Sequence, residues 1–184
     1  LARAWYEKGE YSKAEQIIAS GFAITDTTAH LYMTRALIYM STDRGDLALK
    51  DFSKAIELAP DDEDYYILRA NYYLTISEGY NSYSDISNAI KINPNNAEYY
   101  YYRAYILTNL NVHDEALIDI DKAIKLSPNY ADYYNLKFTI HMNRGEYDQA
   151  EQAVIKSIEI KPNDYYAHLS LGDLYMQISN MDRF

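Results

Sequence analysis

The sequence predicts an all-α fold made of repeated pairs of antiparallel helices, and three observations carry this prediction. All four prolines, Pro60, Pro94, Pro128 and Pro162, follow one another at intervals of 34 residues. Each proline closes a similar phrase, KAIELAP, NAIKINP, KAIKLSP or KSIEIKP. Small residues recur in the same 34-residue frame. A repeat of this period indicates one supersecondary unit that is copied along the chain.

Each copy of the unit has the pattern of two amphipathic helices. With proline at position 32 of the frame, large and mostly aromatic residues recur at positions 4 and 11 and mostly small ones at position 8, which is one face of a first helix. Positions 20, 24 and 27 read small, bulky and small on a second helix. The segments PDD, PNN and PND end one helix and supply Asp or Asn caps for the next. A single hairpin cannot bury its apolar face alone, so the units are expected to stack on their neighbours.

The frame divides residues 1–184 into consecutive repeats of a single domain. A partial repeat spans 1–28, complete repeats span 29–62, 63–96, 97–130 and 131–164, and a partial repeat spans 165–184. Leu1 falls within a first helix and Phe184 falls where a second helix would start. We therefore expect a piece of a longer array, with exposed repeat ends that could support self-association.

The order of aromatic, small, aromatic, small, bulky, small and proline resembles the tetratricopeptide repeat along the whole chain. This resemblance implies a right-handed superhelical solenoid whose first helices line a concave groove for peptides or partner helices. It also implies that positions 2, 5, 9, 12 and 13 face this groove. The groove candidates at these positions are Met33, Leu37, Met40, Ile67, Asn71, Tyr101, Tyr105, Asn109, Asn135, Thr139 and Asn143. The alternative for some of them, the methionines above all, is that they only cover neighbouring helices.

Four consecutive tyrosines, at positions 99–102, stand out in a chain that contains 22 tyrosines. They span more than one helical turn, so they cannot form a single platform. Tyr100 occupies position 4 and is predicted to be buried between helices, whereas Tyr99 is predicted to pack against the preceding unit. Tyr101 is predicted to face the groove, and Tyr102 has no aromatic counterpart in its column.

Charged residues at positions 7 and 23 vary together. Arginine at position 7 accompanies aspartate at position 23 in three repeats, whereas Lys137 accompanies Ala153 in the next. We expect an ion pair between helices in the first three repeats, formed by Arg35 with Asp51, Arg69 with Asp85 and Arg103 with Asp119. The alternative is that the stacked arginines bind an anionic ligand, but each arginine already has a carboxylate in register.

Catalytic and cofactor chemistry has no motif in this sequence. There is no cysteine, the six glycines are too dispersed for a phosphate-binding loop, and the histidines lack metal-ligand spacing. His141 and His168 stand at large core positions, and the DDED segment at 61–64 suits a helix cap better than a cation site. We therefore expect no enzyme, no catalytic or metal site and no cofactor. Phe138, His141, Ala153 and Ser157 depart from the pattern of the other repeats, which predicts an altered helix angle there and leaves their function open.

The net charge of −10 and the pI near 4.8 argue against nucleic acid as a partner. No apolar run is long enough for membrane insertion, so a soluble protein is expected; the compartment is not fixed, with the cytoplasm favoured. Chaperone-binding members of the resembled family bind a terminal carboxylate with Lys, Arg and Asn side chains of the groove. Basic residues are scarce at these positions here, so a neutral or basic partner fits better. The resulting hypothesis is a scaffold that binds a protein or peptide in its groove. The alternative is a self-assembly or spacer segment of a larger multidomain protein.

Overall fold

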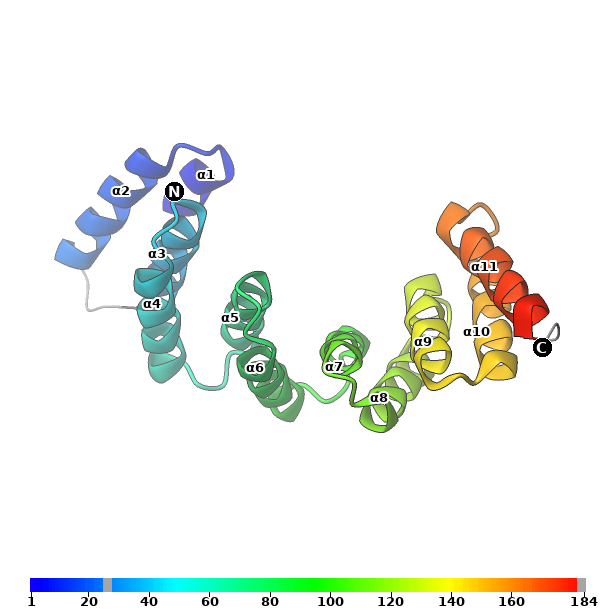
Figure 1. The fold of residues 1–184 in the computed structure, drawn as a ribbon. Coiled ribbons are helices and arrows are strands. Elements are labelled where there is room, and N and C mark those ends of the chain that lie inside the picture. Colours follow the sequence, from blue (N-terminus) through cyan, green and yellow to red (C-terminus); the bar gives the residue numbers. More distant parts are fainter. Residues whose placement is uncertain (25–27, 182–184) are drawn as a thin grey trace. The chain divides into compact units, whose positions relative to one another are not determined.

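The computed structural model describes residues 1–24 and 28–181, and over these residues it forms eleven α-helices and no strand (Figure 1). The prediction of an all-α fold is confirmed. Phe184, where a further helix was expected to start, lies outside the described residues. The helices are α1 (Ala2–Glu7), α2 (Tyr11–Ile24), α3 (Ala29–Ser41), α4 (Gly45–Leu58), α5 (Glu63–Thr75), α6 (Gly79–Ile92), α7 (Ala97–Asn109), α8 (His113–Leu126), α9 (Ala131–Arg144), α10 (Tyr147–Ile160) and α11 (Tyr165–Met181).

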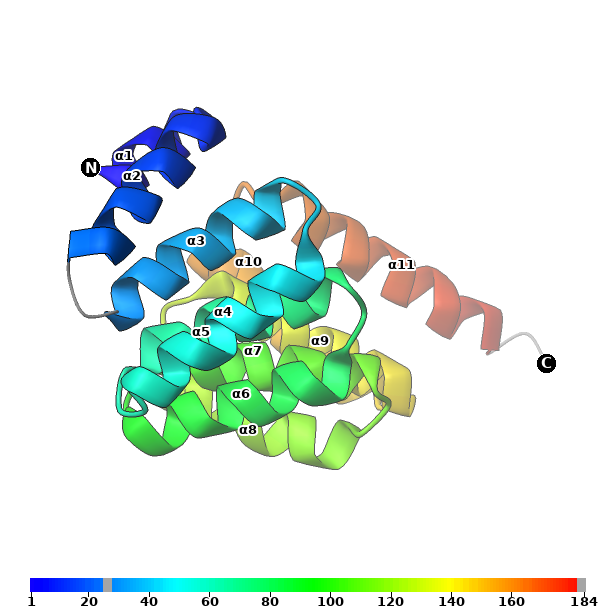
Figure 2. The ribbon, with the colours of Figure 1, turned by 90° about the vertical axis from the view of Figure 1, so that its left-hand side faces the viewer.

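The helices pack as consecutive hairpins in two compact units, Leu1–Asn93 and Pro94–Phe184. The first unit holds the hairpins α1–α2, α3–α4 and α5–α6, and the second holds α7–α8 and α9–α10 followed by α11. The two helices of a hairpin run antiparallel, as Figure 2 shows for α3 and α4. The helices α3, α5, α7 and α9 begin at residues 29, 63, 97 and 131, where the predicted repeats begin. The single-domain boundaries and the handedness of a superhelix stay predictions.

Small residues in the hairpins are buried where the frame placed them. Ala36, Ala48 and Ala55 have no exposed surface, and they surround Phe52, which is also fully buried. An alanine leaves room for a neighbouring helix to approach, and a close-packed phenyl ring fills the remaining space. Burying a side chain of this size contributes about 1.5–3 kcal/mol to folding. The cores of the hairpins therefore depend on the alternation of small and large residues that the frame predicts.

Helix caps occur where the post-proline segments predicted them. The carboxylate of Asp62 accepts a hydrogen bond from the backbone N–H of Asp64 at 3.2 Å. The amide oxygen of Asn96 accepts one from the backbone N–H of Glu98 at 3.0 Å. Asp164 caps α11 by accepting from the N–H of Tyr166 at 3.0 Å. The capping interpretation of the DDED segment is confirmed at Asp62. The exception is Tyr130, which stands at the N-cap of α9 and makes no side-chain cap.

The turn inside each hairpin contains one residue with left-handed backbone geometry, and these residues recur every 34 positions. Their φ angles lie between 58° and 74°, a region that side chains other than Gly, Asn and Asp adopt at a cost. They are Gly9, Asp43, Ser77, Asn111 and Gly145. Glycine occupies two of these turns without strain, while Ser77 is the least suited of the five. The repeat is thus a repeat of backbone geometry as well as of side chains.

The predicted arginine–aspartate pairs are confirmed, and each lies within one hairpin. In α3–α4, α5–α6 and α7–α8, the arginine of the first helix donates Nε to Oδ2 at 2.6–2.7 Å and Nη2 to Oδ1 at 2.7–2.8 Å. The pairs are Arg35 with Asp51, Arg69 with Asp85 and Arg103 with Asp119. In α9–α10 the corresponding residues are Lys137 and Ala153, and Lys137 Nζ instead reaches Asp121 on α8 at 2.7 Å.

Position 4 of the frame is less buried than predicted. Tyr100 is only partly buried, because its hydroxyl donates a hydrogen bond to the carbonyl oxygen of Pro94 at 3.1 Å. Tyr134 donates to Pro128 in the same way at 3.0 Å, and His168, which is exposed, donates from Nε2 to Pro162 at 2.9 Å. A phenol or imidazole needs a polar partner at its tip, so the ring packs along its edge while the donor reaches the turn. The prediction that Tyr100 is buried between helices is therefore wrong.

Candidate partner-binding surface

The groove candidates in the first unit differ widely in exposure. Met33 is 3% exposed and belongs to the core around Phe52, and Leu37 and Met40 are half-buried against that core. Ile67 on α5 is half-buried, and Asn71, one turn later, is exposed. Met33 thus has almost no surface for a partner in this structure.

The groove candidates in the second unit form two rows at helical spacing. On α7, Tyr101 is half-buried while Tyr105 and Asn109 are exposed, and these three residues are four positions apart. On α9 the row consists of Asn135, which is half-buried, followed by Thr139 and Asn143, which are exposed. Residues four apart lie on the same face of a helix. Each row therefore presents one face of its helix, with aromatic and amide groups in reach of a ligand.

A cluster of four tyrosine rings joins the two helices, and we call it the tyrosine cluster: Tyr101, Tyr102, Tyr130 and Tyr133. The ring of Tyr101 on α7 lies 5.2 Å from that of Tyr133 on α9, measured between centroids. Tyr102 lies 5.6 Å from Tyr101, and Tyr130 lies 5.0 Å from Tyr133. Rings at these separations attract each other, by about 0.5–1.5 kcal/mol per pair. The expectation that the column of Tyr99 packs against the preceding hairpin is confirmed for Tyr133.

Burial, together with carboxylates that border the tyrosine cluster, raises the pKa of three of its hydroxyls. Burial and a hydrogen bond that Tyr102 donates to Glu98 Oε1 at 3.0 Å raise the pKa of Tyr102 to about 12. Burial also raises the pKa of Tyr101 and Tyr133, helped by the negative charges of Asp132 and Glu98. The faces of the rings are themselves electron-rich. The cluster and its border therefore form a surface of negative potential that suits a cation better than an anion.

Tyr130 belongs to the tyrosine cluster and does not cap the helix that follows it. The equivalent residues Asp62, Asn96 and Asp164 cap the helices that follow them, whereas Tyr130 does not cap α9. Its side chain is 56% exposed, and its ring contacts Tyr133. Replacing a capping side chain by one that cannot cap costs about 1 kcal/mol. Tyr130 therefore leaves the start of α9 less stable than a capping Asp or Asn would.

The sequence predicted part of this surface. Tyr101 and Tyr105 were identified from their positions in the frame, but the contact of Tyr101 with Tyr133 and the part of Tyr130 were missed. A signal for Tyr130 was present in the sequence: it is the only aromatic residue in a column that otherwise holds Thr28, Asp62, Asn96 and Asp164.

The described part of the chain holds neither a metal-ligand cluster nor a membrane-spanning helix. Within residues 1–24 and 28–181, no group of three or more His, Asp or Glu side chains could hold a metal ion. None of the helices described is long and apolar enough to cross a membrane. His141 is buried as its core position predicted, and its Nδ1 lies 2.7 Å from Oε2 of Glu146.

Solved structures of similar fold include tetratricopeptide repeat proteins. The chain matches a tetratricopeptide repeat protein from Parabacteroides merdae with a TM-score of 0.85 and 19% identity, covering 99% of this chain and 72% of that one. It matches YrrB, described as a TPR protein with an unusual peptide-binding site, with a TM-score of 0.79 and 18% identity over 92% and 87% of the two chains. It matches MamA with a TM-score of 0.79 and 18% identity over 88% and 95%.

Family models give the same answer from the sequence. Models described as tetratricopeptide repeat match residues 29–62, 86–118 and 120–152, which together make up more than half of the chain. No curated protein sequence matches the chain. The matched segments contain the hairpin α3–α4 with its Arg35–Asp51 pair, and all four residues of the tyrosine cluster. The chain therefore belongs to the tetratricopeptide repeat family.

Proposed function

We propose that this chain binds an extended peptide segment of neutral or basic character along the rows of α7 and α9, in the concave groove that the family resemblance implies. Tetratricopeptide repeat folds are in general protein-interaction scaffolds rather than enzymes. The observation that carries the finer proposal is the tyrosine cluster with its border of carboxylates. It combines exposed aromatic surface with negative charge, which are the two properties that attract a cationic side chain.

The two rows offer complementary contacts to a peptide. Tyr105 is 45% exposed and supplies a rigid, amphipathic ring, which is the kind of residue that carries much of the binding energy at interfaces. Asn109 and Asn143 are exposed, and their amides can donate to and accept from a peptide backbone. A surface of this kind can bind the main chain of a peptide together with one or two of its side chains.

Charge favours a lysine or arginine as the anchor. The negative charges that act on Tyr101 and Tyr133 come from Asp132 and Glu98, and the whole chain has a net charge of −10. A guanidinium or ammonium group over the rings would gain about 0.5–2 kcal/mol from the aromatic faces. Opposite net charge also raises the rate of encounter. An acidic peptide would meet repulsion on the same surface.

A selection from a library of random linear peptides tests this proposal. We expect the selected peptides to be enriched in Arg or Lys, and we expect the double variant Tyr101→Ala with Tyr105→Ala to bind them at least about tenfold more weakly. Because Tyr101 is half-buried, Tyr105→Ala alone serves as a second variant that removes only exposed surface. Tyr80→Ala is the matched control, since Tyr80 is 76% exposed on α6. Selected peptides that are acidic, or that bind the Tyr105→Ala variant as tightly as the unaltered chain, would contradict the proposal.

A second candidate, self-association through a repeat end, is favoured by the surface of α11. Tyr165, Tyr166 and Met176 are 70%, 76% and 60% exposed on this helix. Large apolar side chains in this density suit contact with another helix. Sedimentation velocity over a range of concentrations tests it: the unaltered chain should associate, and Tyr166→Ser with Met176→Ser should be monomeric. A chain that stays monomeric at all concentrations would exclude this candidate.

A further inference from the structure

The hairpin α9–α10 contains a pocket of about 510 Å³. Its lining comes from one face of α9 and one face of α10, namely Tyr134, Lys137, His141, Gln149, Gln152, Ala153 and Lys156. Two of these residues are lysines, two are primary amides, and none of the seven is a carboxylate. Its volume lies in the range of about 300–1,000 Å³ that is usual for small-molecule sites. The pocket is separate from the tyrosine cluster and shares no residue with it.

The pocket lies where the three other complete hairpins contain an ion pair. In those hairpins, an aspartate of the second helix holds the arginine of the first with two hydrogen bonds, for example Asp85 with Arg69. Ala153 stands at the position of the aspartate, so both the volume and the negative charge of that side chain are missing. What remains is a depression lined by cations and neutral donors.

The two lysines of the pocket are held only by exposed partners. Lys137 Nζ donates to Asp121 on α8, whose side chain is 58% exposed, and Lys156 Nζ donates to Glu159, also 58% exposed. Ion pairs of this kind are weak, because water competes for both groups and salt screens them. Lys137 and Lys156 can therefore exchange these partners for a ligand at little cost.

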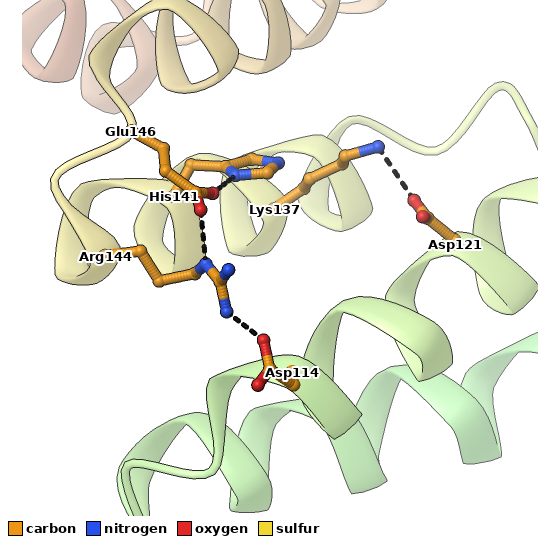
Figure 3. A network of polar contacts seen from close by, with 6 residues as sticks. All are labelled: Asp114, Asp121, Lys137, His141, Arg144 and Glu146. Carbon is orange, nitrogen blue, oxygen red and sulfur yellow. Dashed lines mark hydrogen bonds and ion pairs between the residues drawn. The ribbon is translucent and has the colours of Figure 1, made fainter.

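His141 fixes one wall of the pocket. Its Nδ1 lies 2.7 Å from Oε2 of Glu146, and the other oxygen of that carboxylate accepts from Nε of Arg144 at 2.7 Å (Figure 3). Arg144 also contacts Asp114 on α8. This network holds the imidazole beside Lys137, one turn away on α9, so hydrogen bonds fix one wall of the pocket.

We propose that this pocket binds a carboxylate group, which takes the place of the aspartate that the other hairpins supply internally. Lys137 and Lys156 provide the charge, and the amide groups of Gln149 and Gln152 donate further hydrogen bonds. A carboxylate accepts several donors at once, and hydrogen bonds between ionised partners are stronger than neutral ones. The pocket is larger than one carboxylate, so the ligand also carries a polar body. The carboxylate belongs either to a free small acid or to the acidic side chain of a polypeptide.

Binding of succinate and of the capped peptide acetyl-Glu-Glu-Glu-amide, followed by NMR chemical shifts and calorimetry, tests the proposal and separates the two sources. We expect at least one of these probes to bind, and uncharged succinamide not to bind. Lys137→Gln and Lys156→Gln should each weaken binding about tenfold, since each removes a charge-assisted hydrogen bond. Lys125→Gln makes the same change of charge at an exposed position on α8 outside the pocket, and it should leave the affinity unchanged. Binding of succinate alone assigns a free acid, and binding of the peptide alone assigns an acidic segment.

The double variant Lys137→Arg with Ala153→Asp gives the sharpest result. It rebuilds the ion pair of the three other hairpins, so it should fold, and its own carboxylate should occupy the site and abolish binding of both probes. If this variant folds and still binds as well as the unaltered chain, the proposal is wrong. Failure of both probes to bind, or binding of inorganic phosphate without either carboxylate probe, would overturn it as well. None of these outcomes depends on the peptide surface of α7 and α9.

Discussion

The hairpins α3–α4, α5–α6 and α7–α8 differ from α9–α10 in how they satisfy the cation at position 7. In the first three, arginine pairs with an aspartate inside its own hairpin, and the side chains of Asp51, Asp85 and Asp119 are only 4–8% exposed. In the fourth, Lys137 crosses to the preceding hairpin and pairs with Asp121, which is 58% exposed. The same backbone frame thus accepts two electrostatic solutions. In the first solution, the ion pair joins the two helices of one hairpin. In the second, the ion pair joins the hairpin to its neighbour and a pocket remains inside the hairpin.

The largest effect that separates the two solutions is expected from removing the carboxylate. Asp85→Ala should lower the free energy of unfolding by about 2–4 kcal/mol, because it leaves the guanidinium of Arg69 largely buried without its partner. Asp121→Ala, which removes the partner of Lys137, should cost less than about 1 kcal/mol, because that pair is exposed to water. Urea denaturation followed by circular dichroism measures both. Equal losses in the two variants would show that the position of the aspartate does not matter.

The next effect concerns the start of α9. Tyr130→Asp should raise the free energy of unfolding by about 1 kcal/mol, because it introduces a cap like those at Asp62, Asn96 and Asp164. The same change should weaken binding of basic peptides, because it removes an exposed ring of the tyrosine cluster. Asn96→Ala is the reverse control, and it should lower stability by a similar amount. A variant at Tyr130 that loses stability would mean that the ring contributes more to folding than a cap does.

A smaller effect is expected in the turns. Ser77→Gly should stabilise the chain by about 0.5–1 kcal/mol, because serine is strained at a φ of 62° whereas glycine is not. Gly145→Ser, in the corresponding turn of α9–α10, should destabilise by a similar amount, since Gly145 has a φ of 70°. Thermal and urea unfolding measure both variants. If the two changes have the same sign, the strain does not lie in the backbone of these turns.

The smallest effect is a pH dependence that arises from Glu146 in the fourth hairpin. The hydrogen bonds from His141 and Arg144 lower the pKa of Glu146 below its ordinary value of 4.5. Because the pKa of the folded state is the lower one, the linked stability is complete above about pH 4.5 and is lost as the pH falls through the lowered value. In Glu146→Gln, the decline of stability below this pH should be shallower than in the unaltered chain. Glu159→Gln, which pairs only with the exposed Lys156, is the control; equal slopes in the unaltered chain and in Glu146→Gln would contradict the linkage.

The features that followed from the sequence are those set by spacing along one hairpin. Arg69 and Asp85 are 16 residues apart, a distance that the 34-residue frame fixes, and the cap at Asn96 depends only on the residues next to it. The burial of Tyr100 was predicted wrongly. The frame gives the side of the helix that carries the ring, but it does not contain the hydrogen bond from the hydroxyl to the carbonyl of Pro94, which holds the ring toward the turn.

The features that escaped sequence reasoning depend on distances between hairpins. The 5.2 Å contact of Tyr101 with Tyr133 joins residues 32 positions apart, and its geometry follows from how α7 and α9 pack. Lys137 carries a long, flexible chain that can reach several carboxylates, so its choice of Asp121 could not be read from periodicity. Tyr130 was detectable in principle, because it breaks a column of capping residues.

The ion pairs between α8 and α9 bear on how cooperatively the second unit unfolds. In a linear repeat protein, contacts within a hairpin set its intrinsic stability, and contacts between hairpins set how strongly one opening event propagates to the next. Lys137 with Asp121, Arg144 with Asp114 and the Tyr101–Tyr133 contact all belong to the second kind. The hairpins α7–α8 and α9–α10 should therefore open as one block, with amides of α8 and α9 exchanging their hydrogens at matched rates.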